Sequence, residues 1–138
     1  MTDWNQQIIE EFRANEGRVG GNFEGRTLLL LHHTGAKSGT ERVNPLAYQR
    51  LSDSSVAIFA SKGGAPTTPD WFYNLVANPD VTVEIGTETF GGRARVAAGD
   101  ERSEIWERQK SDAPAFAEYE SKTQGIREIP VVVLDLAA

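Results

Sequence analysis

Three strand candidates follow one another early in this chain with only short turns between them. The first, at residues 26–33, is a continuous leucine run that ends in two histidines. The other two are extended segments at residues 42–51 and 56–60. The turns, 34–40 and 53–55, are too short for the crossover that a parallel pair of strands needs. The order therefore predicts two successive hairpins, and it argues against a Rossmann or P-loop domain, in which strands alternate with helices.

The rest of the chain predicts three more strands and four helices. Apolar residues recur at spacings of three and four from Trp4 to Phe12, which predicts an N-terminal helix over about 3–15 whose stripe contacts the core. Thr68 as N-cap, followed by Pro69 and Asp70, predicts the start of a central helix. The remaining predicted elements are a hairpin of 81–85 and 89–97, two short acidic helices at 100–110 and 114–122, and a last strand at 131–136.

These elements predict a mainly β (α+β) fold. About six largely antiparallel strands, with a helix at the start, one in the middle and two before the last strand, fit a closed or split β-barrel. Pro45 lies inside a predicted strand and marks an edge position or a bulge, since proline cannot donate to a ladder. With 138 residues, we expect one domain over 1–138, of which 1–20 form the N-terminal helix and loop.

Charge and composition exclude several classes of function. The net charge is −6, which disfavours nucleic acid and anionic lipid as partners. No cysteine is present, so disulfides, thiolate metal sites and cysteine nucleophiles are excluded. The N-terminus does not read as a signal peptide, and the longest apolar run, 28–31, is too short to cross a bilayer. We therefore expect a cytoplasmic protein without stable membrane insertion that acts on a small molecule.

Two glycine-bounded turns are candidates for an anion site. The first, 34–40, carries Lys37 and Ser38, and the second, 61–64, carries Ser61 and Lys62 just before the central helix. Glycine lets backbone N–H groups converge on an anion, while lysine and serine add a charge and a donor. The segment 32–66 is net +2 within the acidic chain, which favours a negatively charged small ligand. The first turn taken alone is better explained as a simple hairpin turn with a solvated lysine.

The central helix offers a second kind of binding group. Trp71 and Asn74 are three residues apart and share a face, so an amide lies beside an aromatic wall, as a flat heterocycle requires. His32 and His33 are adjacent on a strand, point to opposite faces and cannot chelate one metal together. We assign both histidines a structural role.

In this order, the motifs resemble those of the deazaflavin-dependent nitroreductase family of actinobacteria, in the flavin-reductase-like split-barrel superfamily. The matching stretches are residues 34–39, 42–46, 60–64 and 71–79, and residues 129–133 are similar to the last strand of that family. The resemblance covers nearly all of the chain from Gly20 onward and implies a split β-barrel that binds coenzyme F420.

The resemblance also implies where the cofactor lies. By position, Lys37, Ser38 and Arg42 would hold its phosphate and acidic tail, and Ala60, Ser61 and Lys62 would add a second group of contacts. The cofactor ring would be bounded by residues of the second predicted strand and of the central helix. They are Val43, Asn44 and Pro45 on the strand and Trp71, Phe72 and Asn74 on the helix.

The implied activity is hydride transfer from reduced F420 to an organic acceptor such as a quinone, a nitro compound or a conjugated enone. Chemistry resides in the deazaflavin, so we assign no catalytic acid or base. Tyr48, Phe116 and Tyr119 are the candidates for the acceptor pocket. Alternatives that the sequence leaves open are an FMN-binding barrel oxidoreductase and a non-catalytic F420 carrier or sensor, and it leaves open whether the protein is a monomer or a homodimer.

Overall fold

The computed structural model describes residues 4–14, 28–36, 39–61, 64 and 66–137. Six strands close into an antiparallel barrel in the order β1-β2-β3-β6-β5-β4. They are β1 (Leu28–Thr34), β2 (Glu41–Ser52), β3 (Ser55–Phe59), β4 (Asp80–Ile85), β5 (Glu88–Val96) and β6 (Val131–Leu136). The helices are α1 (Trp4–Ala14), α2 (Asp70–Ala77), α3 (Gly99–Asp112) and α4 (Ala115–Thr123). The predicted mainly β barrel with its four helices is confirmed.

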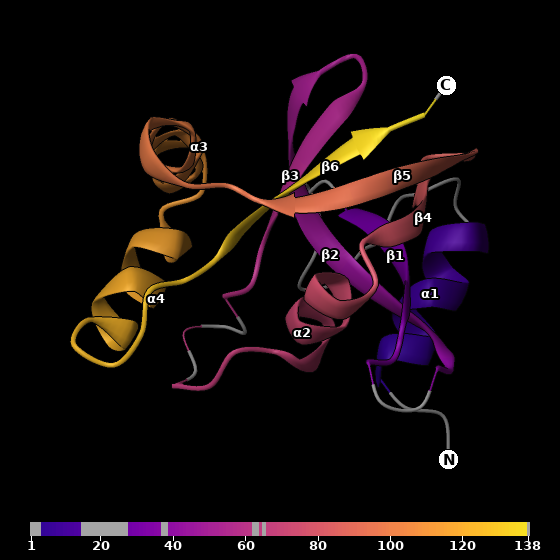
Figure 1. The fold of residues 1–138 in the computed structure, drawn as a ribbon, viewed down its shortest axis with the longest axis horizontal. Coiled ribbons are helices and arrows are strands. Elements are labelled where there is room, and N and C mark those ends of the chain that lie inside the picture. The colour runs from indigo at the N-terminus through magenta and orange to yellow at the C-terminus, as the bar shows by residue number, and fades with distance from the viewer. Residues whose placement is uncertain (1–3, 15–27, 37–38, 62–63, 65, 138) are drawn as a thin grey trace.

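Helices cover the barrel on two sides (Figure 1), where α1 lies beside β1 and the α3–α4 pair lies on the opposite side. Ile9 and Phe12 of α1 pack against Leu28 and Leu30, which confirms the predicted core contact of this helix. The odd-numbered leucines of β1 face the interior instead, where Leu29 and Leu31 are fully buried. Both faces of β1 are therefore covered, as its continuous apolar run predicted.

Pro45 is tolerated because β2 has only one neighbour at that position. Pro45 is paired with Leu30 of β1, whereas the pairing of β2 with β3 begins at Tyr48. A missing N–H therefore leaves no gap in a second ladder. The irregularity in β2 falls further along, between Arg50 and Ser52. Of the two explanations predicted for Pro45, the local edge is correct.

An ion pair joins α1 to the barrel wall. The Arg13 guanidinium donates to both carboxylate oxygens of Glu84 on β4, at 3.2 and 2.7 Å, and His32 Nε2 lies 2.5 Å from the same carboxylate. The Arg13 hydrogen bond is the largest cause of a lowered pKa at Glu84. Since a carboxyl with a lowered pKa stabilises the fold only when ionised, this contribution exists above its unfolded-state pKa and is lost as the pH falls through its folded-state pKa.

We expect Glu84→Gln to lower the free energy of unfolding by about 0.5–1 kcal/mol near neutral pH, because it removes a partly exposed ion pair. The deficit should shrink as the pH falls below about 4.5, the ordinary value for this carboxyl. Urea denaturation at a series of pH values measures it. Glu88→Gln, an exposed carboxylate at the start of β5, is the matched control and should show no such deficit. A Glu84→Gln deficit that stays constant down to about pH 3 would contradict this account of the ion pair.

Candidate functional site

Helix α2 closes one end of the barrel with its buried face. Trp71 and Leu75 lie in the interior core cluster, and Asn74 is buried beside them. The helix begins one residue later than the predicted cap implies. Pro69 occupies the N-cap in an extended conformation, with no side-chain cap bond, so the prediction of Thr68 as N-cap is wrong. The ring of Pro69 fixes its φ at −65°, so the backbone turns into the helix at this residue.

A cleft of about 730 Å³ opens between α2, the end of β1 and the start of β2. Four of the predicted cofactor residues line it, namely Arg42, Asn44, Trp71 and Asn74. The predicted shared face of Trp71 and Asn74 is confirmed. The cleft also contains His33 and Tyr73, to which the sequence interpretation gave no binding role. Side chains alternate in direction along β1, so His33 points inward and His32 points outward, where it contacts Glu84.

One chain of hydrogen bonds crosses the cleft. The Ala36 N–H donates to Asn74 Oδ1 at 2.9 Å, and Asn74 Nδ2 lies 3.2 Å from His33 Nδ1. His33 Nε2 in turn lies 2.7 Å from Asn44 Oδ1. These hydrogen bonds link the turn after β1, helix α2, strand β1 and strand β2, so they hold four separate segments in one arrangement.

The imidazole of His33 is held neutral by this environment. Its side chain is only 3% exposed, and this burial is the main cause of a pKa below the ordinary value for histidine. The nearby positive charge of Arg42 lowers the pKa further, whereas the hydrogen bond to Asn44 opposes the shift. A neutral ring can accept at one nitrogen while it donates at the other, which is what its two amide partners require.

Arg42 differs from the other arginines in the described part of the chain. Its exposed guanidinium makes no ion pair, hydrogen bond or ring contact there. By contrast, six others pair with carboxylates or carbonyl oxygens, and Arg50 stacks on Tyr48 at 5.8 Å. Asp70 also lines the cleft. A free cation at the mouth of a cleft can bind an anionic group without first giving up another partner.

The backbone amides of the first turn are used differently from the prediction. The Gly35 N–H donates to Thr40 O, the Gly39 N–H to Gly35 O, and the Ala36 N–H to Asn74. Gly39 has a φ of 68°, which favours glycine at this place in the turn. None of these three amides is available for an anion. Anion binding at this turn would therefore depend on other groups, among them Lys37 and Ser38, which lie outside the described residues.

The second turn is clamped by a residue that the sequence interpretation missed. Arg127 donates from one guanidinium nitrogen to Ala60 O at 3.1 Å and from the other to Ser61 O at 3.0 Å. Ala60 is itself fully buried, and its N–H donates to Pro130 O. No local sequence signal pointed to Arg127, because its acceptors are backbone carbonyls 66 and 67 residues away. Lys62 lies outside the described residues.

Of the remaining predicted cofactor residues, those that the structure describes do not line the main cleft. Val43 packs against the core under α1, and Pro45 is partly buried in the ladder with β1. Phe72 lies at a separate apolar cleft of about 210 Å³ between α2 and β5. The structure thus brings together Arg42, Asn44, Trp71 and Asn74, and it leaves Val43, Pro45 and Phe72 apart from them.

The predicted acceptor residues gather around a different cleft. Tyr48 and Phe116 both line a space of about 430 Å³ between β2 and the α3–α4 connection. Tyr119 packs against Phe116 with ring centroids 5.1 Å apart. The backbone of α4 lies close to the second turn, since a Cβ on Gly64 would lie 3.2 Å from the Tyr119 Cα.

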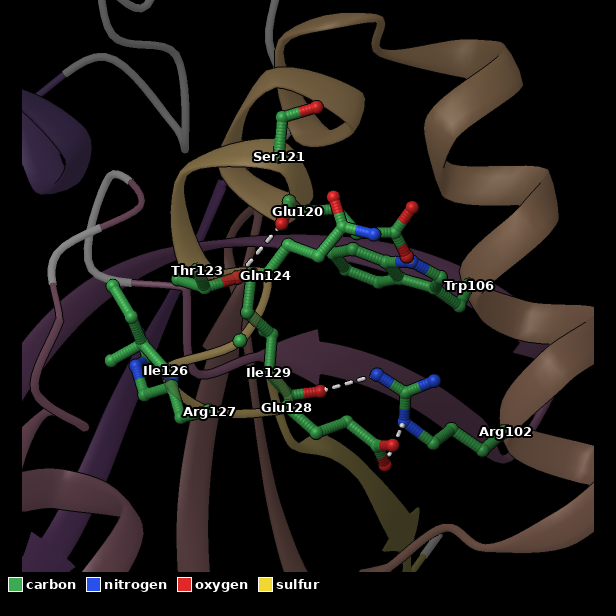
Figure 2. A pocket seen from close by; sticks show the side chains of 11 residues that line it. Arg102, Trp106, Glu120, Ser121, Thr123, Gln124, Ile126, Arg127, Glu128 and Ile129 are labelled. Carbon is green, nitrogen blue, oxygen red and sulfur yellow. Dashed lines mark hydrogen bonds and ion pairs between the residues drawn. The ribbon is translucent and has the colours of Figure 1, made fainter.

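Figure 2 shows another pocket, of about 580 Å³, lined by α3, α4 and the segment before β6. Several of its polar side chains are held by neighbours, although the buried Arg102 Nε has no hydrogen-bond partner among the described residues. Arg102 donates to Ile129 O and pairs with Glu128, and the Trp106 indole donates to Glu120. Arg127 is engaged by the carbonyls of the second turn. We therefore assign this pocket a structural role.

Metal binding and membrane insertion are two further possibilities for the described residues. No group of three or more histidine, aspartate or glutamate side chains there could hold a metal ion. None of the described helices is long and apolar enough to span a membrane.

Comparison with known proteins identifies the family of this chain. The sequence profile of a family described as F420H2-dependent quinone reductase matches residues 4–135. This chain belongs to that family. The resemblance found in the turn and helix motifs is thereby confirmed, as is F420 as the cofactor.

Individual relatives agree with the family assignment. An F420H2-dependent quinone reductase of Mycobacterium tuberculosis is 41% identical over 127 residues, which cover 89% of this chain and 83% of that protein. A solved F420H2-dependent reductase of class FDR-A is 38% identical with a TM-score of 0.70, over 78% of this chain and 93% of that one. Another solved structure, described as a domain-swapped dimer, is 35% identical with a TM-score of 0.72, over 94% and 92% of the two chains.

This chain is thus an F420-dependent oxidoreductase with a split-barrel fold. Of the alternatives that the sequence left open, neither the FMN-binding oxidoreductase nor the non-catalytic carrier or sensor agrees with a family of F420H2-dependent reductases.

Proposed function

We propose that this protein reduces quinones with F420H2 and that the cleft under α2 holds the cofactor. The single observation that supports this most strongly is the set of open donors in the cleft. Arg42 is free of partners in the described part of the chain, and the Asn44 amide nitrogen makes no hydrogen bond there. A ligand with an anionic tail and a flat polar ring matches a cation, an amide donor and the Trp71 wall.

The chain's own residues would bind and orient the cofactor. Arg42, with Lys37, Ser38 and Lys62, would hold the anionic tail, and Asn44, Asn74 and Trp71 would border the ring. Val43, Pro45, Phe72, Ala60 and Ser61 would support these contacts, with Arg127 fixing the carbonyls of the second turn. When bound, F420H2 supplies a hydride that, together with a proton, reduces a quinone to the hydroquinone.

The acceptor would bind toward the other end of β2. Tyr48 is four residues beyond Asn44, a distance of about 13 Å along a strand. Tyr48 and Phe116 share a cleft there, and Tyr119 supports Phe116. A cofactor ring that lies along β2 would reach toward this aromatic cleft, which suits a flat apolar quinone. Small-molecule partners, a cytoplasmic location and a monomeric or homodimeric state belong to the same proposal.

We expect Arg42→Gln to raise the Kd for F420 by about tenfold or more, because it removes a charge-assisted contact to the anionic tail. Titration followed by deazaflavin fluorescence measures it. The matched control is Arg93→Gln on β5, where an exposed arginine pairs with Asp80 at 3.5 Å. The control should leave the Kd unchanged. Equal affinities of the two variants would show that Arg42 is not part of the cofactor site.

We expect Tyr48→Ala to raise the KM for a simple quinone such as menadione by about fivefold or more, because it removes an aromatic wall of the acceptor cleft. The Kd for F420 should stay within about twofold of the unmodified protein, since Tyr48 lies outside the cofactor cleft. Steady-state kinetics with saturating F420H2 measures the first effect and fluorescence titration the second. A Tyr48→Ala protein with unchanged KM, or with F420 binding as impaired as in Arg42→Gln, would exclude the proposed acceptor cleft.

A further inference from the structure

The hydrogen-bond chain across the cleft has a fixed direction. It starts at the backbone N–H of Ala36, which can only donate, and this bond goes to Asn74 Oδ1. The oxygen end of the Asn74 amide is therefore fixed, and its nitrogen end must face His33. An amide nitrogen can only donate, so His33 Nδ1 is the acceptor of this bond.

The same direction continues through the imidazole. A neutral ring whose Nδ1 accepts carries its proton on Nε2, and that nitrogen lies 2.7 Å from Asn44 Oδ1. The burial of His33 favours this neutral form. The Asn44 oxygen is held by His33, so the amide nitrogen is the end of this group that makes no hydrogen bond to the described part of the chain.

We propose that His33 is a positioning residue that holds the oxygen of the Asn44 amide, so that its nitrogen is the end of the amide that donates a hydrogen bond to the ligand in the cofactor cleft. The proposal rests on the assignment of the cleft to F420. It specifies which part of the ligand Asn44 binds, namely a ring carbonyl or an unprotonated ring nitrogen and not a ring N–H. Without His33, the Asn44 side-chain amide could rotate by half a turn. It would then present its oxygen, in place of its nitrogen, to the ligand.

Two conservative substitutions separate this role from a merely structural one. In His33→Gln, the amide nitrogen can occupy the position of Nε2 and still donate to Asn44, whereas the contact to Asn74 is lost. In His33→Asn, the shorter amide can replace Nδ1 and accept from Asn74, whereas the contact to Asn44 is lost. Both variants put an uncharged amide in the same buried place, so they serve as controls for each other.

The test is the Kd for F420 of these variants, together with their thermal unfolding midpoints. We expect His33→Asn to raise the Kd by about tenfold and His33→Gln by less than about threefold, with similar unfolding midpoints. Asn44→Ala should match His33→Asn, and the double variant His33→Asn/Asn44→Ala should be no worse than Asn44→Ala alone, because His33 acts through Asn44. His32→Asn, on the opposite face of β1, should bind F420 normally.

Equal losses in His33→Asn and His33→Gln, or additive losses in the double variant, would overturn the positioning role while leaving F420 binding itself intact. An unmodified protein that fails to bind F420 would instead overturn the cofactor assignment, and the role of His33 with it.

Discussion

Asn74 holds helix α2 against the end of the barrel, and the cleft that we propose for the cofactor depends on this contact. Its amide oxygen accepts from the Ala36 N–H and its nitrogen reaches His33, so one buried side chain connects the helix to the turn after β1 and to β1 itself. Trp71 and Leu75 supply the apolar part of the same attachment. Because a buried amide without partners is costly, the chain can bury Asn74 only in the arrangement that satisfies it.

The local pattern of the sequence was sufficient to predict the elements, and it was insufficient for the contacts between distant ones. Hairpins β1–β2 and β4–β5 follow from extended segments separated by short turns, and both are present. The closing pairs β1–β4, β3–β6 and β5–β6 carry no signal within a single segment. The number and order of the strands predicted a closed or split barrel, as did the family resemblance, but not which strands pair to close it. The shared face of Trp71 and Asn74 was predictable because helical spacing decides it.

The role of His33 could not be predicted from its own neighbourhood. Alternation along β1 showed that it opposes His32, but its partners Asn44 and Asn74 are 11 and 41 residues away, and their positions depend on strand register and on the placement of α2. The structural role assigned to His32 agrees with its contact to Glu84. For His33 the same assignment omitted its place in the cleft. The backbone amides of the first turn illustrate the converse error, since glycine content suggested open donors that the fold uses internally.

The most direct test of the account is to map F420 binding by chemical-shift changes in the NMR spectrum of the labelled protein. Two buried indoles report on two separate regions, Trp71 on the cleft under α2 and Trp106 on the pocket of Figure 2. The account predicts that F420 shifts the Trp71 indole signal and the side-chain amide signals of Asn44 and Asn74, while the Trp106 indole signal stays in place. A shift of Trp106 with no change at Trp71, Asn44 and Asn74 would contradict it.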